Sequence, residues 1–302
     1  MRRLIAWCAA AVLVSLGGPT AQATDKVPGT VAEKDRIVTG GRPVGISLPQ
    51  RQIGIAIDIG RVAQAANGGG ALGWFIIDRM DDRRETMTTA ARLQAEATVG
   101  PLRQTLERFD VDALALATTK AALVKPDWFQ ARSVIASKDP PSENRTALYA
   151  SVNAPQYAFI DYRYDLSADF TQIRVFADIR LARQTLVKGK ITGPPEIFYQ
   201  QRLASIVQLR DRSYEPRENA AHWAANDGKL AKSALTTAFA RLETMIPYAL
   251  SLNPADLSGF AAKNREKAYA AGFYGSLIAR DKSEADDILI WSNGLIHSQP
   301  AS

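Results

Sequence analysis

Two aspartates within residues 156–210 are the side chains in this sequence that could carry out a reaction. Asp161 and Asp169 lie close in sequence to arginines such as Arg163. A pair of carboxylates is the arrangement with which glycoside hydrolases protonate a leaving group and attack a sugar ring. Pairing of aspartates with arginines across neighbouring strands would explain the same residues without any chemistry. No hydrolase motif accompanies them, so we predict no catalytic residue and keep a hydrolase as the alternative.

Histidine adds one residue to that alternative. His222 lies beside Trp223 and near Asp227, but no G-x-S-x-G motif supplies a nucleophile. The alternative site therefore consists of Asp161, Arg163, Asp169 and His222. The other histidine, His297, is expected on the surface of a terminal hairpin. Histidines so far apart lack the spacing of a zinc site, and we predict no metal and no cofactor.

The segment with the most unusual composition is residues 67–80 (NGGGALGWFIIDRM). Its glycines match G-x-G-x-x-G formally, but the strand and the helix that a dinucleotide site needs are missing around them. Two interpretations remain: a glycine-led helix start packed tightly on a sheet, or an apolar element that docks into lipid or a partner groove. The candidate docking residues are Leu72, Trp74, Phe75, Ile76 and Ile77.

The first 23 residues have the pattern of a secretory signal peptide. Arg2 and Arg3 precede an apolar run over residues 4–16, and Ala21-Gln22-Ala23 offers a small-x-small cleavage site. The run is shorter than the about 20 residues that a membrane span needs. We therefore expect a periplasmic protein. Cleavage would remove Cys8, the only cysteine, and with it disulfide and thiolate chemistry.

Charge narrows the classes of partner. The 37 basic and 31 acidic residues give a net charge of +6, which loss of Arg2 and Arg3 lowers by two. The basic residues are interspersed with acidic ones and form no long run, so we expect no nucleic-acid partner. The hydrophobic content of 46% is typical of a globular protein.

Residues 156–210 form the stretch around which other elements must pack. Between residues 173 and 181, Ile173, Val175, Ala177, Ile179 and Leu181 alternate with polar or larger residues, as on a sheet with one buried face. Strand-prone runs on either side predict an antiparallel meander. Its apolar face needs a cover, and the best candidate is an amphipathic helix over residues 229–246, whose apolar stripe includes Leu235, Phe239 and Leu242.

The predicted fold class is α+β, an antiparallel sheet with a central meander at about residues 156–210, covered by amphipathic helices. Helices are also predicted over residues 81–109 and 112–123, an exposed connection over 124–144, and a hairpin at Asn293-Gly294. We predict a loose leader over residues 24–42 and one domain over 43–302. Residues 253–302 could form a helical and C-terminal hairpin subregion within it.

Residues 50–250 resemble uncharacterised proteobacterial cell-envelope proteins. The resemblance rests on the signal, the glycine-rich block, residues 164–170 (YDLSADF) between two strands, and Trp223 before Asn226-Asp227-Gly228 and a helix. The layout is more distantly similar to curli-export lipoproteins and to lipoprotein activators of cell-wall synthases, although this chain lacks their lipobox cysteine. The resemblance implies an envelope location and a non-enzymatic role. Because the chain is expected to be exported and has no catalytic constellation, we expect it to act by binding an envelope protein or a membrane surface, with no prediction of oligomeric state.

Overall fold

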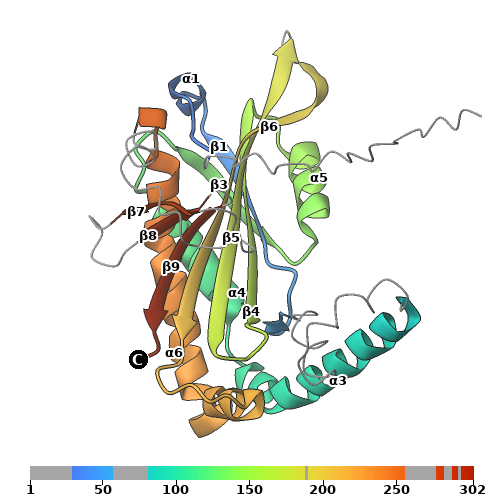
Figure 1. Ribbon diagram of the computed structural model, residues 1–302. Coiled ribbons are helices and arrows are strands. Elements are labelled where there is room, and N and C mark those ends of the chain that lie inside the picture. The colour runs from blue at the N-terminus through green and yellow to red at the C-terminus, as the bar shows by residue number, and fades with distance from the viewer. Residues whose placement is uncertain (1–28, 57–80, 188–189, 256–276, 282–287, 292–293) are drawn as a thin grey trace, which may run out of the picture.

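The computed structural model describes residues 29–56, 81–187, 190–255, 277–281, 288–291 and 294–302. The described residues form a nine-stranded sheet in the order β3-β1-β4-β5-β6-β9-β8-β7, with β2 paired to β4 (Figure 1). The strands are β1 Arg42–Ser47, β2 Gly54–Ile55, β3 Ala131–Ser137, β4 Gln156–Leu166, β5 Gln172–Val187, β6 Lys190–Gln208, β7 Leu277–Asp281, β8 Ile288–Trp291 and β9 Gly294–Pro300.

The predicted meander is the centre of this sheet. β4 and β5 pair antiparallel, and so do β5 and β6. The sheet as a whole is mixed, however, because β1 runs parallel to β3 and β4, β2 runs parallel to β4, and β9 runs parallel to β6. The prediction of an antiparallel sheet is therefore confirmed for the meander but not for the sheet as a whole. Periodicity identifies a strand but carries no information on the direction of a neighbour that is far away in sequence.

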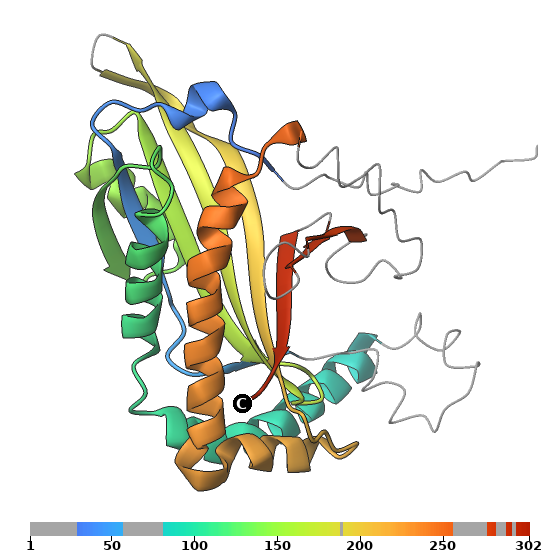
Figure 2. The same ribbon diagram turned by 90° about the vertical axis from the view of Figure 1, so that its left-hand side faces the viewer.

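Helices lie on both faces of the sheet. They are α1 Glu33–Arg36, α3 Asp81–Leu106, α4 Val111–Leu123, α5 Pro141–Ser151 and α6 Pro216–Ser251. Figure 2 shows α4 and α6 in front of one face, whereas α5 packs on β1 from the other side (Figure 1). In the part of the chain that the structure describes, no helix is long and apolar enough to cross a membrane.

The helix predicted to cover the meander is the second part of α6. Leu235, Phe239 and Leu242 are buried in one cluster with Ile173 and Val175 of β5, which confirms the predicted packing. α6 is kinked where the sequence shows a break: Asn226, Asp227 and Gly228 all have left-handed backbone angles. Gly228 also lies so close to Thr105 of α3 that a Cβ atom there would overlap it.

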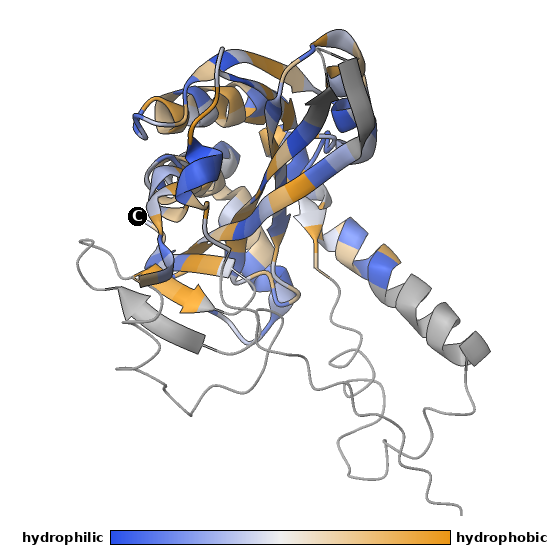
Figure 3. Ribbon diagram, turned by 90° about the horizontal axis from the view of Figure 1, so that it is seen from above, coloured by the Kyte–Doolittle hydropathy of each residue, from blue (hydrophilic) through white to orange (hydrophobic). Residues whose placement is uncertain are grey.

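The two faces of the meander differ in character. On the face toward α4 and α6, the odd-numbered apolar residues of β5 join one large core. Hydrophilic and hydrophobic residues alternate along the central strands (Figure 3), and the even-numbered residues of β5 that point to the opposite face include Arg174, Asp178 and Arg180. There α5 covers a small cluster around Tyr157 and Phe159, and a separate cluster contains Phe176, Ala204, Ile206 and Ile296. This second face carries most of the charged side chains of the sheet.

Part of the predicted loose leader is packed into the domain, because Arg42 holds it. The Arg42 guanidinium is fully buried and donates to five acceptors: the Gln156 side chain and the carbonyls of Trp128, Phe129, Asp35 and Arg36. Burial lowers the Arg42 pKa to about 10, with the charge of Asp35 opposing this change. All five guanidinium N–H groups are thus satisfied.

The predicted C-terminal hairpin forms, since β8 and β9 pair antiparallel, although Gly294 belongs to β9, opposite Trp291, rather than to the turn. β9 also pairs with β6, so the hairpin is part of the main sheet. His297 on β9 is 1% exposed, so its predicted surface position was wrong. Side chains of β9 point alternately to the two faces of the sheet, and the side chain of His297 points to the face that α6 covers. His297 lies opposite Ser205 of β6.

Candidate functional site

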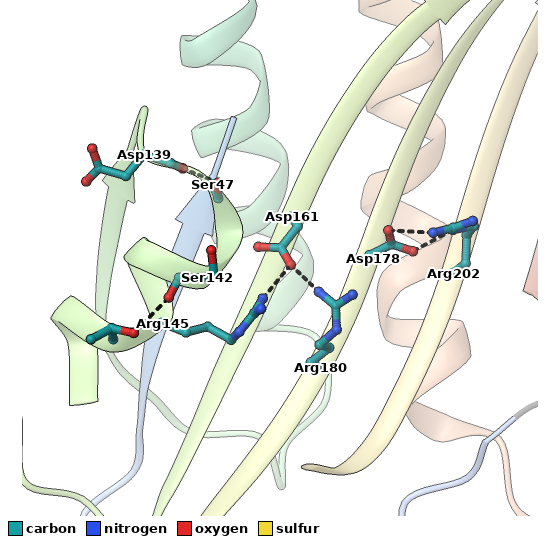
Figure 4. A network of polar contacts seen from close by, with 9 residues as sticks. Ser47, Asp139, Ser142, Arg145, Asp161, Asp178, Arg180 and Arg202 are labelled. Carbon is teal, nitrogen blue, oxygen red and sulfur yellow. Dashed lines mark hydrogen bonds and ion pairs between the residues drawn. The ribbon is translucent and has the colours of Figure 1, made fainter. Parts of the chain in front are cut away.

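The second face of the meander gathers five charged side chains from four elements. We call Arg145, Asp161, Asp178, Arg180 and Arg202 the charged cluster (Figure 4). Asp161 of β4 lies directly opposite Asp178 of β5, and Asp178 lies opposite Arg202 of β6. Arg180 comes from β5, and Arg145 reaches the sheet from α5. The period of two along each strand places these residues on one face.

Arginines hold both aspartates of the cluster. Two carboxylates directly opposite each other on neighbouring strands repel, so this pair requires nearby cations. Asp178 accepts two bonds from Arg202, at 2.7 and 3.0 Å. Oδ2 of Asp161 accepts from Arg180 and, at 3.3 Å, from Arg145. The result is two neighbouring ion-pair groups: one joins α5 to β4 and β5 through Asp161, and the other joins β5 to β6 through Asp178.

One carboxylate oxygen of the charged cluster has no hydrogen-bond partner. Oδ1 of Asp161 is buried and accepts no hydrogen bond, although the side chain is only 7% exposed. Burial raises the Asp161 pKa; Arg180 and Arg145 oppose the shift, and Asp178 adds to it. A buried carboxyl group with a raised pKa is a feature of general acids, and it is also the ordinary cost of burying a carboxylate in an ion pair.

A second ion-pair group continues along the same face toward the β4–β5 turn. Arg174 bonds Asp165 at 2.7 Å, and Arg163 lies 3.7 Å from the same carboxylate. The Arg163 guanidinium also lies over the Phe176 ring, 4.5 Å from its centroid. Burial raises the Asp165 pKa, which the two arginines oppose. This face therefore carries ion-paired side chains of both signs, next to apolar side chains such as Phe176.

The structure does not bring the four residues of the alternative site together. Asp161 lies within β4, whereas Asp169 follows the end of that strand, which is about 16 Å beyond Asp161 at the usual rise per residue. Asp169 accepts from Ser167 and Thr171 and so holds the β4–β5 turn. Arg163 belongs to the Asp165 group, and His222 is exposed on α6.

Two hollows formed by described residues lie away from these carboxylates. One of about 840 Å³ lies between the ends of α3 and α4 and residues 50–53, and its lining includes Arg51 and Arg108 but neither Asp161 nor Asp169. Another, of about 300 Å³, is lined by His222, Lys229 and Ser233. Among the described residues, no group of histidines, cysteines and acids is arranged to hold a metal ion. The candidate docking residues Leu72, Trp74, Phe75, Ile76 and Ile77 lie outside the described residues.

Sequence reasoning singled out Asp161 but missed Arg202 and Arg145 of the charged cluster. Arg202 was detectable, because it has the strand parity that places it opposite Asp178. Arg145 was not detectable from the sequence. It directly follows the predicted exposed connection over residues 124–144, and no sequence pattern indicates that α5 packs on the sheet.

Comparison with known proteins adds no relative to this description. No protein-family model, no curated protein and no solved structure matches the chain. The resemblance to cell-envelope proteins therefore stays a prediction.

Proposed function

We propose that this protein is exported to the periplasm and acts in the cell envelope by binding a protein partner, without catalysis. The observation that supports the proposal best is the state of the central carboxylates. Asp178 and Asp161 are engaged by arginines, and Asp169 is used in a turn. A hydrolase needs such groups in a concave site, close to one another and to substrate.

A protein partner fits the second face of the meander better than a membrane surface does. Anionic lipid attracts segments with an excess of Lys and Arg. Here the charges alternate in sign, with Asp161 and Asp178 between arginines, and Arg163 is half-exposed above Phe176. Mixed charges around aromatic and apolar groups are typical of protein–protein interfaces, in which Arg and aromatic residues are enriched.

Two exposed neutral residues allow this surface to be tested without breaking an ion pair. Gln200 lies on β6 opposite Arg180, and Ser298 lies on β9 opposite Ile206. We expect Gln200→Trp and Ser298→Trp to abolish a specific crosslink between this protein and an envelope protein in intact cells, with little change in thermal stability. The matched control is Thr236→Trp on the exposed side of α6, which should keep the crosslink.

Three outcomes would contradict the proposal. A protein recovered from the cytoplasm would refute export, and a crosslink that survives both tryptophan variants would place binding elsewhere. Recovery with lipid vesicles in the absence of any protein partner would favour a membrane surface.

A periplasmic hydrolase is the second candidate, favoured by one observation: Asp161 and Asp178 face each other, and the buried Asp161 has a raised pKa. Opposed strand positions bring side chains within about 5 Å, the separation of the carboxyl groups in retaining glycosidases. If this candidate holds, the purified protein cleaves activated glycosides, and Asp178→Asn and Asp161→Asn each abolish turnover in a folded protein. Absence of turnover in the wild-type protein across substrates would remove it.

A further inference from the structure

The hollow of about 840 Å³ between the ends of α3 and α4 and residues 50–53 is large enough to hold a small molecule. We call it the α3–α4 hollow. Sites for small molecules usually enclose about 300 to 1,000 Å³ and combine apolar walls with a few polar groups. Leu106 at the end of α3 and Val111 at the start of α4 line the hollow and belong to the main core. The lining contains no residue of the charged cluster, so a ligand here would be independent of the proposed protein partner.

One wall of the α3–α4 hollow carries a hydroxyl group that the fold does not use. Tyr164 of β4 lines the hollow and is only 4% exposed. Gln50 engages its backbone N–H and carbonyl, at 2.8 and 3.1 Å, but the Tyr164 hydroxyl forms no hydrogen bond with the described residues. A tyrosine buried to this extent usually has a hydrogen-bond partner for its hydroxyl group, and the hollow is where a ligand atom can reach it.

The Tyr164 hydroxyl is a donor at neutral pH. Burial raises the Tyr164 pKa to about 12, and the charge of Asp112 adds to this shift. The hydroxyl group therefore keeps its proton and can donate it to an oxygen atom of a ligand.

Two of the basic side chains around the hollow are also unengaged. Arg51 and Arg108 are exposed and form no ion pair with described residues. Arg103, by contrast, pairs with Glu96 and donates to the Ile53 carbonyl at 3.2 Å. The two free guanidinium groups are thus available to an anion.

Most of the acidic side chains around the hollow are already used. Asp112 pairs with Lys138 at 2.6 Å, and Asp110 caps α4 by accepting from the Ala113 N–H at 2.9 Å. Glu107 is left as an exposed carboxylate without an ion pair to described residues. The unengaged charges are therefore two cations against one anion. The exposed amides of Gln52 and Gln104 add neutral hydrogen-bonding groups.

We propose that the α3–α4 hollow binds a small polyhydroxylated anion, whose carboxylate or phosphate group lies at Arg51 and Arg108 while another of its oxygen atoms accepts from Tyr164. Guanidinium groups bind carboxylate and phosphate oxygens through paired, charge-assisted hydrogen bonds. Hydroxyl groups of the ligand complement the amides of Gln52 and Gln104, and its carbon skeleton covers the apolar wall.

Three probes with a similar carbon skeleton test the class of ligand: gluconate, sorbitol phosphate and neutral sorbitol. Isothermal titration calorimetry at low ionic strength measures their affinities, because salt screens exposed charges. At least one of the two acids should bind roughly 10-fold or more tightly than sorbitol. Binding of gluconate alone assigns a carboxylate ligand, and binding of sorbitol phosphate alone assigns a phosphate ligand. An affinity for both acids no higher than that for sorbitol overturns the proposal.

Tyr164→Phe tests the buried donor, because it removes the hydroxyl group and keeps the ring. We expect it to weaken binding of the acid probe roughly 2- to 10-fold, with little change in the unfolding temperature. The matched control is Tyr162→Phe, whose hydroxyl lies 2.8 Å from Oγ1 of Thr119 inside the core. The control should lower the unfolding temperature and leave the affinity as in the wild type. Unchanged affinity in the Tyr164 variant would refute the site.

The two arginines are tested in the same way. Arg51→Ala and Arg108→Ala should each weaken binding of the acid probe roughly 10-fold, through loss of a charge-assisted hydrogen bond. Arg212→Ala, at an exposed arginine outside the lining, removes the same charge and should leave the affinity nearly unchanged. Equal losses in all three variants would show general attraction of anions to a basic protein and would overturn the proposed site.

Discussion

Arg42 shows, at the scale of one residue, how a cation can lie in the core without a carboxylate as hydrogen-bond partner. Its planar group matches five fixed acceptors contributed by three parts of the chain. A lysine has three donors, so Arg42→Lys leaves at least two of these five acceptors unpaired. We expect a loss of at least about 2 kcal/mol in the free energy of unfolding, measured by chemical denaturation.

The control for Arg42 is Arg108→Lys in the exposed turn that follows α3, which should change stability by less than about 0.5 kcal/mol. Equal effects of the two substitutions would show that the five hydrogen bonds of Arg42 do not stabilise the fold.

Asp169 should make the stability of the fold depend on pH, and the direction of this dependence follows from its pKa. Burial opposes ionisation, but hydrogen bonds from Ser167 and Thr171 outweigh it and lower the Asp169 pKa below its ordinary value. A carboxyl group with a lowered folded-state pKa stabilises the fold above its unfolded pKa of about 3.9, and this stability is lost as the pH falls through the folded-state pKa. Asp169→Asn should therefore destabilise the protein at neutral pH and flatten the acid limb of its stability curve.

Thermal unfolding from pH 7 down to acid measures this effect. Asp211→Asn, at an exposed carboxylate, serves as the control and should leave the acid limb as it is in the wild type. An acid limb that is equally steep in the Asp169 variant would contradict the assignment.

At the scale of elements, α6 couples the sheet to α3 and α4. Leu235 is fully buried between the helix and β5. We expect Leu235→Ala to cost about 2 to 5 kcal/mol, because it removes a core side chain and leaves a cavity. Thr236→Ala, one residue along on the exposed side, should change stability by less than about 0.5 kcal/mol. A loss below about 1 kcal/mol at Leu235 would mean that α6 is not the main cover of the meander.

The kink in α6 depends on one glycine. Gly228 has a left-handed backbone and lies against Thr105 of α3. Gly228→Ala should destabilise the protein by more than about 1 kcal/mol, through backbone strain and overlap with Thr105. In the double variant with Thr105→Ala, the closest clash, with Oγ1 of Thr105, is removed although the Cβ of residue 105 remains, so part of the loss should return. No recovery in the double variant would show that backbone strain alone explains the effect.

Elements with a strong local pattern were predictable from the sequence. The period of two along residues 173–181 indicated β5, the apolar stripe indicated α6, and Asn293-Gly294 indicated the β8–β9 hairpin. Pairings over a long sequence distance were not predictable, because the parallel partners of β1 and β6 leave no local signal. Asp161 and Asp178 lie on strands that are adjacent in sequence, so their pairing could be anticipated. The contact between Arg145 and the sheet could not, because no local pattern indicates that α5 packs there.

At the scale of the whole molecule, the sheet depends on residues near the C-terminal end of the sequence. β9 lies between β6 and β8, and Leu295 is fully buried in the main core. We expect removal of residues 294–302 to leave β6 as an unprotected edge and to yield an aggregating chain without a cooperative thermal transition. Circular dichroism and light scattering measure both properties. A soluble shortened chain that melts cooperatively would contradict this prediction.

The late position of β9 also affects when the protein can fold. A long stretch of chain separates β9 from β6, and parallel pairing over such a distance forms slowly because the intervening loop must close first. A polypeptide that has been synthesised only as far as β6 has no β9, so its sheet stays incomplete until β9 emerges. On the proposed route to the periplasm, this order of assembly would keep the chain fit for translocation and would delay completion of the sheet until β9 has crossed.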